Sequence, residues 1–458
     1  MALEKQQNTI LNYVDFTGGM NSAVPATSLQ DNEYQLIKNL EFNFNKLCTR
    51  GGLSAPLATF PANIVAIHFD EGTHETVAVL ADKSVYHIAA NFVITKFSGT
   101  IVGSKKPVFC DFDGRVFVAS GGKLQYIDFV AKSVNTINAS KNCDNVFENF
   151  GRLVTTIAGD DYLWYSAVGD PYSEKAWDTT SEENSNDDSL AKFIEAGYKD
   201  NGDIIKVLPI AGDLAVFKNN GVVYGVSGQY PNWSVQKIAE HTDVLNAEAL
   251  CTVQSTIAFM TTLGLKSLQT TAVYGNFGVD ELARRINRSV AESVYQPRLY
   301  NLVRKRQLMI FPNTDSDNSL KKCFCFAYDL NAGIEMEFAY PIYDMQDTPN
   351  GVLIASGNSI YKWSMDYADD NGTPIQQAII TKKYATSNRL YTRMVDIGVL
   401  GEEGKLVTMK WADKTVNYKI PAKRRMIHVF SVCRESVFEV YTEAKIALEY
   451  IKLYIFEQ

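Results

Sequence analysis

Short runs of alternating hydrophobic and polar residues recur along the chain at intervals of about 40 to 50 residues. In each run Val, Ile, Leu or an aromatic residue takes every second position, which is typical of a strand with one buried face. The runs end at polar turns such as DEG, FDG, GDD and KNNG, where Gly and Asn supply the positive φ of tight hairpins. The pattern predicts small antiparallel sheets stacked around an axis, which is a β-propeller.

We assign about six such blades, over residues 64–97, 107–129, 145–167, 204–228, 249–269 and 298–364. The polar, acidic stretch 178–193 is expected to be a projecting surface loop. After a turn-rich boundary at 365–374, about seven short strands follow, enough for a small β-sandwich or barrel. The predicted fold is all-β: an N-terminal arm and propeller entry over 1–55, a propeller over 56–366 and a C-terminal β domain over 374–458.

Helical periodicity is rare in this sequence. The best candidate is LQDNEYQLIKNLE at 29–41, where Asp31 or Asn32 would cap a short helix. The polar segment before Gly18 is expected to be an extended arm that either closes the propeller or reaches a neighbouring subunit.

Composition and charge argue against some functional classes of protein. Hydrophobic residues make up 46% of the chain and charged residues 21%, which is ordinary for a globular protein. The net charge of −8 argues against a dedicated nucleic-acid binder, because such proteins neutralise phosphates with a basic surface. A mildly acidic wall is nevertheless compatible with a passage through which DNA slides without sticking.

The cysteines and the apolar runs indicate in which compartment the protein is made and whether it spans a membrane. The seven cysteines are scattered without CxxC spacing, so we expect reduced, structural thiols, with Cys323 and Cys325 on one face of a strand. The N-terminus lacks the basic and apolar regions of a signal peptide, and no apolar run approaches 20 residues. We therefore expect a protein made in the cytoplasm, with no membrane span.

Adjacent acids are the first candidates for catalysis, since a glycosidase needs two carboxylates about 5 to 10 Å apart. Each pair here lies in a predicted turn, where Asp caps the backbone with its own side chain. The sialidase signature SxDxGxTW is absent from the sequence. The pairs are Asp111 with Asp113, Asp160 with Asp161, Asp315 with Asp317, and Asp369 with Asp370.

Metal and nucleophile motifs are incomplete. The stretch TDSDNSLKK at 314–322 lacks the Gly and Glu of a calcium loop, and HETVA at 74–78 lacks the second His of a zinc pair. GVSGQ at 225–229 has no strand-to-helix turn after it, and phosphate-binding glycine motifs are absent from the sequence. We assign no catalytic, cofactor-binding or metal-binding residue, and expect no cofactor and no enzymatic activity.

Three basic clusters leave two interpretations open: contact with acidic partner subunits, or a solvated face. They comprise Arg284, Arg285, Arg288, Arg304, Lys305 and Arg306, and in the C-terminal domain Lys423, Arg424 and Arg425.

The aromatic stretch GDDYLWYSAVGDPYSEKAW at 159–177 is interpreted as a corner. Its strand is predicted to end at Ser166, and Pro171 fixes φ and prevents further pairing. Trp164 and Trp177 are expected to pack between blades rather than to stack on sugars.

This stretch also resembles a family. GRLV, then LWYSAVGDP, then a Trp is similar to the β-propeller proteins of tailed-phage necks and tails, called short-tail stabilisation, nozzle or tubular proteins. The family's opening, in which GG, a proline, DNE, N and RGG recur, resembles residues 18–53. Its central blade resembles IKVLPIAGDLAVFKNNGVVYGVSG, and its next blade resembles IAFMTTLGLKSL. The last strand before its C-terminal domain resembles NSIYKWS, so the similarity covers most of the chain, although several family members are much longer.

The resemblance implies a structural virion protein that forms a homo-oligomeric ring of six copies. Such a ring joins the portal and adaptor to other tail proteins, or lies at the distal end of the tail as a nozzle. Its channel passes DNA during genome ejection without specific binding. The protein would be assembled in the host cytoplasm and reside in the virion.

Two alternatives come from other functional classes. A propeller glycan-binding protein or glycosidase predicts solvent-facing Trp and paired carboxylates in one pocket. An intracellular propeller scaffold like the WD-repeat proteins would carry recurring GH or WD signatures, and neither recurs in this sequence.

Overall fold

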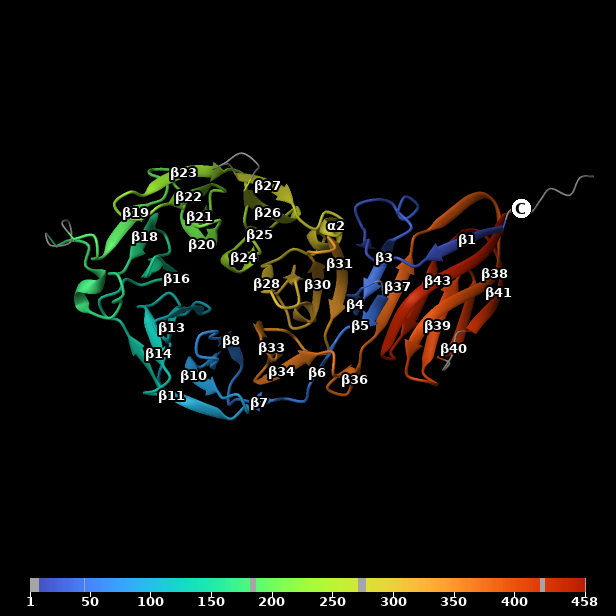
Figure 1. The fold of residues 1–458 in the computed structure, drawn as a ribbon, viewed down its shortest axis with the longest axis horizontal. Coiled ribbons are helices and arrows are strands. Elements are labelled where there is room, and N and C mark those ends of the chain that lie inside the picture. Colours follow the sequence, from blue (N-terminus) through green and yellow to red (C-terminus); the bar gives the residue numbers. More distant parts are fainter. Residues whose placement is uncertain (1–7, 45, 182–186, 271–276, 421–424, 458) are drawn as a thin grey trace, which may run out of the picture.

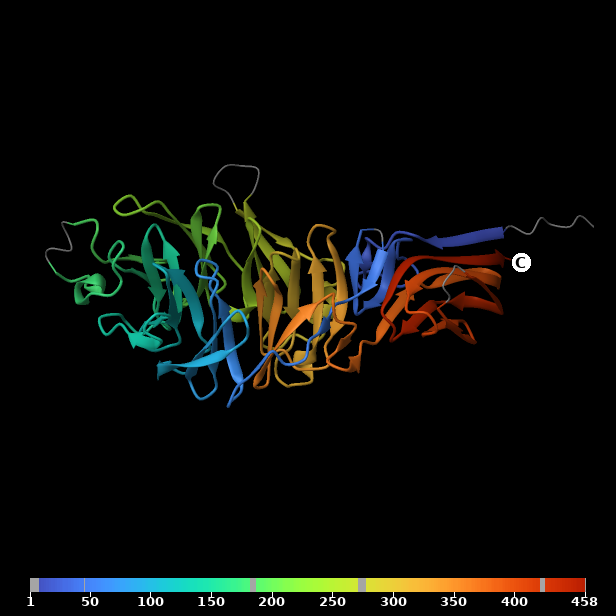
Figure 2. The same ribbon diagram turned by 60° about the horizontal axis from the view of Figure 1, so that its bottom comes forward.

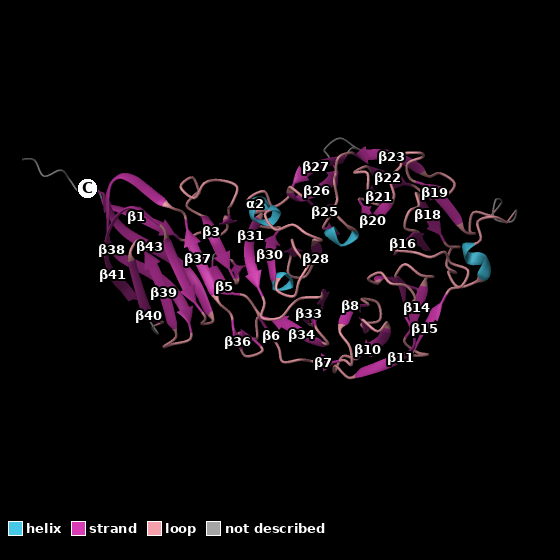
Figure 3. Cartoon of the chain, turned by 180° about the vertical axis from the view of Figure 1, so that it is seen from behind, coloured by secondary structure: helices cyan, strands magenta, loops and turns pink. Residues whose placement is uncertain are grey.

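The computed structural model describes residues 8–44, 46–181, 187–270, 277–420 and 425–457. A ring of short sheets forms one end of an elongated molecule, and a second, smaller β domain forms the other (Figures 1 and 2). The described elements are nearly all strands, with a few short helical turns (Figure 3). The predicted fold, an all-β propeller followed by a small C-terminal β domain, is confirmed. Among the described helices, none has the length and apolar character to span a bilayer.

Each propeller unit is an antiparallel sheet whose consecutive strands pair with one another. The first contains β8 (Ile64–Phe69), β9 (Thr76–Leu80), β10 (Ser84–Ile88) and β11 (Ile94–Thr100). The second contains β12 (Val108–Phe112), β13 (Arg115–Ala119), β14 (Gln125–Asp128) and β15 (Ser133–Thr136). The third contains β16 (Asn145–Asn149), β17 (Arg152–Thr156), β18 (Tyr162–Tyr165) and β19 (Lys192–Glu195).

The fourth unit contains β20 (Ile204–Ile210), β21 (Asp213–Lys218), β22 (Val223–Ser227) and β23 (Ser234–Ala239). The fifth contains β24 (Leu250–Val253), β25 (Thr256–Thr261), β26 (Gly264–Thr270) and β27 (Phe277–Glu281). Neighbouring units pack face to face. Between the first and second, for example, Val79 and Val85 pack in one cluster with Val116 and Ile127, all of them buried. Burial of both faces explains why the middle strands read as hydrophobic runs.

Residues 298–364, assigned above to one blade, are divided between two sheets. The sixth unit contains β28 (Arg298–Leu302), β29 (Gln307–Phe311), β30 (Lys322–Ala327) and β31 (Ala332–Glu337). The seventh contains only β32 (Asp344–Thr348), β33 (Gly351–Ser356) and β34 (Ser359–Ser364) from this region. Its outer strand is supplied by β6 (Gly52–Leu53) and β7 (Ala58–Thr59), which pair with β34. The hydrophobic pattern of this region predicts only three strands, because the fourth comes from residues near the N-terminus.

The predicted helix over 29–41 is wrong. These residues form β3 (Glu33–Lys38) and β4 (Leu40–Asn43). β3 pairs with β37 (Gln377–Thr381), placing Leu36 opposite Ile380 and Ile37 opposite Ile379. The pairing of distant apolar residues outweighs the weak helical preference of the segment.

The N-terminal segment belongs to the C-terminal domain. β1 (Asn8–Tyr13) pairs along its length with the last strand, β43 (Ile446–Glu457), as Figure 2 shows. β5 (Lys46–Thr49) also pairs with β43, and β2 (Gly19–Met20) runs parallel to β3. Closure of the propeller, one of the two roles considered for the segment before Gly18, falls instead to β6 and β7, while β1 from that segment joins the neighbouring domain.

The C-terminal domain has two sheets around one core. The first sheet has the order β4-β5-β43-β38-β41, with β38 (Tyr384–Gly401) and β41 (Arg425–Ser436), and β1 pairs with β43. The second continues from β3 and β37 through β42 (Phe438–Thr442), β39 (Leu406–Trp411) and β40 (Lys414–Lys419). Leu390 and Leu453 of the first sheet share a buried cluster with Val407 and Val440 of the second. This arrangement is a β-sandwich.

The two domains meet at Arg50-Gly51-Gly52, where the chain leaves the sandwich for the propeller. The Arg50 side chain is 1% exposed and forms a two-pronged ion pair with Asp370 in β35 (Asp369–Asp370), with N···O distances of 3.0 and 2.7 Å. A Cβ on Gly52 would lie 2.0 Å from the carbonyl oxygen of Asp369. Only glycine allows that approach, so the RGG sequence has a structural explanation at the junction.

The aromatic stretch at 159–177 is a corner. β18 ends at Tyr165, and Gly169 has a φ of 70°. The Asp170 carboxylate accepts the backbone N–H of Tyr172 at 2.9 Å, just before the 3₁₀ turn Glu174–Trp177. Trp177 is buried in the cluster between the second and third units, as predicted for packing between blades.

Trp164, unlike Trp177, does not lie in the cluster between blades, so the prediction that it packs between blades is wrong. It is half-buried, and its ring lies beside that of Phe193 across the β18–β19 pair, with centroids 5.3 Å apart. The Lys141 ammonium sits over the indole ring at 4.0 Å.

Candidate functional site

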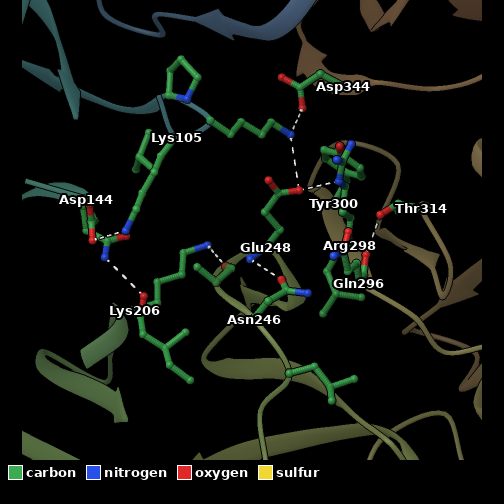
Figure 4. Close-up of a pocket in the computed structure, with 18 of the residues that line it drawn as sticks. Lys105, Asp144, Lys206, Asn246, Glu248, Gln296, Arg298, Tyr300, Thr314 and Asp344 are labelled. Carbon is green, nitrogen blue, oxygen red and sulfur yellow. Dashed lines mark hydrogen bonds and ion pairs between the residues drawn. The ribbon is translucent and has the colours of Figure 1, made fainter. Parts of the chain in front are cut away.

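A cavity of about 990 Å³ lies where the innermost strands of the propeller converge. Most of its walls come from the first strand of a unit or from the turn just before that strand, and the rest from turns between later strands, so residues far apart in sequence face one another (Figure 4). Pockets of this size, with apolar walls and a few charged groups, are typical of ligand sites. The axial cavity is therefore the first place to look for chemistry.

An ion-pair network links several blades across this cavity. The Lys106 ammonium, just before β12, lies 3.2 Å from Asp344 of β32 and 3.7 Å from Glu248 of the 3₁₀ turn Ala247–Ala249. The Arg298 guanidinium of β28 lies 2.5 Å from Glu248. The other Asp344 oxygen accepts the backbone N–H of Ile67 in β8 at 2.8 Å. Elements of five units are thus held together at the axis.

The charges around Lys106 determine its protonation. Burial disfavours its charged form, but Asp344, Tyr300 and Glu248 more than offset this and raise the pKa of the Lys106 ammonium. Burial also raises the pKa of the Tyr300 hydroxyl to about 12. Both groups keep their ordinary protonated forms at neutral pH.

Lys206 of β20 has a different environment in the same cavity. Its ammonium donates to two backbone carbonyls, Ala247 O at 3.0 Å and Leu250 O at 2.9 Å. No carboxylate of the described chain lies within 4 Å of it. Burial lowers the pKa of Lys206. This is the cation of the cavity whose charge is least compensated.

The walls between these charges are largely apolar and aromatic, including Phe109, Leu299 and Met345. His68 stacks on Phe109 with ring centroids 4.9 Å apart. None of the described lining residues is a tryptophan. Of the four acids in the lining, Glu248 and Asp344 share the Lys106 ammonium, Asp144 pairs with Lys105, and Asp203 accepts a hydrogen bond from Asn219. The described lining therefore lacks the Trp platform expected of a lectin.

The acids that the sequence places in adjacent pairs each have a hydrogen-bond or ion-pair partner of their own. Asp160 accepts the N–H of Asp161, and Asp369 accepts the N–H of Gly372, as expected of turn residues. The others bind side chains: Asp111 contacts His68, Asp113 contacts Tyr172, Asp161 contacts Lys218, Asp315 contacts Ser319, Asp317 contacts Tyr343, and Asp370 contacts Arg50. Glu248 and Asp344 had no distinguishing motif, because only the closed ring brings them together.

The basic clusters make contacts within the chain. Arg285 pairs with Glu33, Arg304 with Glu71 and Lys305 with Glu41, joining segments more than 200 residues apart in sequence. Arg284, Arg288 and Arg306 pair locally with Glu281, Glu292 and Asp329. Lys423, Arg424 and the side chain of Arg425 lie outside the described residues.

Two further questions are whether the cysteines form disulfides and whether any cluster of side chains could bind a metal ion. All seven cysteines are free, and Cys323 and Cys325 are both buried on β30. Burial raises the pKa of both thiols. In the described part of the chain, no cluster of three or more His, Cys, Asp or Glu could hold a metal ion.

A second feature is an apolar surface on the sandwich, which we call the outer face. It lies on the first sheet and includes Ile10, Met426, Phe430 and Val432, which are 52%, 47%, 70% and 54% exposed. Cross-strand pairs place these residues on one side: Ile10 opposite Tyr454, Tyr454 opposite Met394, Met394 opposite His428, and Tyr391 opposite Val432. β41 pairs only with β38 among the described strands, so its other edge is unpaired. In the sequence, MIHVFSV at 426–432 is apolar on both faces, a signal that such a surface needs covering.

No protein-family model matches this chain, and no curated protein matches it. Similar solved structures include the extracellular domain of the putative one component system BT4673 from B. thetaiotaomicron, at 9% identity and a TM-score of 0.48. That match covers 88% of this chain and 59% of the other, so the chain spans less than two thirds of that extracellular domain.

Two propeller domains are also similar to the chain. The WD40 domain of Doa1 has 12% identity and a TM-score of 0.43, covering 69% of this chain and 96% of that one. The domain of Myceliophteria thermophila Cps50 (Swd1) has 8% identity and a TM-score of 0.47, covering 69% and 99%. The resemblance to phage neck and tail proteins stays a prediction.

Proposed function

We propose that this chain is a structural subunit of a tailed-phage neck or tail, and that copies of it assemble into a ring. The observation that carries the proposal is the outer face with its unpaired β41 edge. A twelve-residue edge strand with Phe430 and Val432 exposed is a ready template for association. The sequence resemblance supplies the setting, the copy number of six and the portal, adaptor and tail proteins as partners.

The occupant that we propose for the outer face is a second copy of this chain. A closed ring requires a heterologous contact that turns each copy by a constant angle. Here the sandwich that carries the outer face is fixed to the propeller by the buried Arg50–Asp370 pair and by one continuous core. A contact at one end of the molecule therefore sets the orientation of the whole propeller.

The route for DNA in this proposal is the opening of the ring, between copies. The axis of a single propeller is bridged by Lys106, Glu248 and Arg298, so it is an unsuitable conduit. A net charge of −8 favours passage over capture, because phosphate binding requires clustered cations.

The test is the mass of the purified chain by light scattering over a range of concentrations, alone and with candidate partner rings. We expect a multimer of the 51.1 kDa chain that is visible as a ring by electron microscopy. The double variant Phe430→Ser/Val432→Thr should shift the mass toward the monomer. The control Val130→Ser removes an even more exposed apolar side chain, 96% exposed, from a propeller turn and should leave the mass unchanged.

Two results would contradict the proposal. One is a strict monomer at every concentration and with every partner ring. The other is a multimer whose mass the Phe430→Ser/Val432→Thr variant does not alter, since assembly would then use another surface.

A further inference from the structure

We propose that the axial cavity binds a small organic anion, and that its phosphate or carboxylate group contacts Lys206. This inference is independent of ring assembly, because every group it uses lies inside one propeller. It rests on how the charged groups of the cavity are paired, on the geometry of Lys206 and on the size and walls of the space.

The pairing of the charged groups comes first. The cavity lining includes four cations and four acids: Lys105, Lys106, Lys206 and Arg298, and Asp144, Asp203, Glu248 and Asp344. Glu248 and Asp344 both contact Lys106, Glu248 also contacts Arg298, Asp144 pairs with Lys105, and Asp203 accepts a hydrogen bond from Asn219. Among the described lining residues, Lys206 is therefore the cation with no carboxylate within 4 Å.

The geometry of Lys206 leaves one of its hydrogen-bond donors for a ligand. An ammonium has three N–H donors, and two of them reach Ala247 O and Leu250 O. Since Lys206 lines the cavity, the third donor is left for a molecule inside it.

Lys106 provides an internal comparison for Lys206. Both residues are lysines at the same cavity, yet their pKa values move in opposite directions, and the difference is the acid beside Lys106. An oxyanion beside Lys206 would supply the same compensation, through a charge-assisted hydrogen bond of the stronger kind.

The space limits the class of ligand. A cavity of about 990 Å³ is far larger than a bare phosphate ion and matches a molecule of metabolite size. Phe109, Leu299 and Met345 give the body of such a molecule apolar contacts, while the fixed cation orients its acidic end. A small organic anion satisfies both requirements.

Calorimetric titration of the full chain tests the proposal, with inorganic phosphate and acetate as separate probes at constant ionic strength. We expect one of them to bind at millimolar concentration or below. Binding of phosphate alone would identify a phosphorylated ligand, and binding of acetate alone a carboxylate. The variant Lys206→Gln keeps an N–H donor for the carbonyls but loses the charge, and should weaken binding at least about tenfold.

Lys105→Gln is the control, because Lys105 lies at the rim, is 53% exposed and pairs with Asp144. It should bind the probe like the unmodified protein. Absence of binding by both probes, or equal binding by Lys206→Gln, would overturn the proposal. A crystal grown with arsenate gives a readout that needs no variant: anomalous density beside Lys206 Nζ supports the site, and its absence there contradicts it.

Discussion

Replacing Arg50 by Met should loosen the junction between the propeller and the sandwich. Arg50 Nη1 and Nη2 donate to the two Asp370 oxygens at 3.0 and 2.7 Å. They also donate to Gly51 O and Glu337 O, each at 2.7 Å, and Nε donates to Asn39 Oδ1 at 3.1 Å. Methionine fills a similar volume and offers none of these donors, so the packing is largely kept while the polar contacts are lost.

The expected cost follows from burial. The Asp370 side chain is 3% exposed, and without Arg50 its charge remains buried beside the Ala339 N–H as its remaining donor among the described contacts. Removing one partner of a buried pair costs about 3 to 5 kcal/mol. That is a large part of a total stability of about 5 to 15 kcal/mol. Arg50→Lys keeps the charge but loses the two-pronged geometry, and should cost less.

Urea unfolding followed by tryptophan fluorescence measures the effect, because Trp363 donates to Gly51 O at 2.9 Å within the junction. Hydrogen exchange should show that β6 and β34 separate more readily in Arg50→Met. The double variant Arg50→Met/Asp370→Leu should recover much of the lost stability, since no unpaired charge remains. Arg288→Met, at an exposed pair, should change stability by less than about 1 kcal/mol. A loss below about 1 kcal/mol for Arg50→Met would refute the reasoning.

Three further outcomes are expected. Gly52→Ala should lower the free energy of unfolding by about 1 to 3 kcal/mol in urea titrations, because its Cβ would lie 2.0 Å from Asp369 O; a neutral effect would contradict the close approach. Cys323 and Cys325 should react with a thiol reagent only after unfolding, since both are buried and their pKa values are raised. Reaction at the rate of the partly exposed cysteines would argue against this. The stability of the protein relative to Lys206→Gln should increase as pH rises toward the ordinary lysine pKa of about 10.4, because burial lowers the pKa of Lys206 and the unfolded chain then binds more protons. A flat or falling difference in calorimetric scans would oppose this.

The local pattern predicted much of the propeller. In IIKVLPIAGDLAVFKNNGVVYGVSG, alternation and two polar turns marked the strands that became β20, β21 and β22. Each antiparallel hairpin forms between neighbours in sequence, so its strands and its turn can be read within a short window. The corner at Pro171 and the buried Trp177 followed from the same local rules.

The errors and omissions all concern contacts between distant segments. The 29–41 segment became β3 and β4 because β37 lies beside it, and the seventh unit was completed by β6 and β7 from the N-terminal region. The outer face depends on β1 and β43, the two ends of the described chain. Strand propensity says nothing about which distant partner a strand will find.

The amino-acid sequence by itself determined the class of this protein: alternating strands, tight turns, a boundary near 365–374 and free cysteines, all of which follow from local chemistry. Only the tertiary structure decided how the ring closes, which domain the N-terminal strands join, and that Lys106, Lys206, Glu248 and Asp344 share one cavity. The physical reason is that hydrogen bonding within a hairpin depends on a few neighbouring residues. Charge compensation at the axis depends on blades that are far apart in sequence coming together.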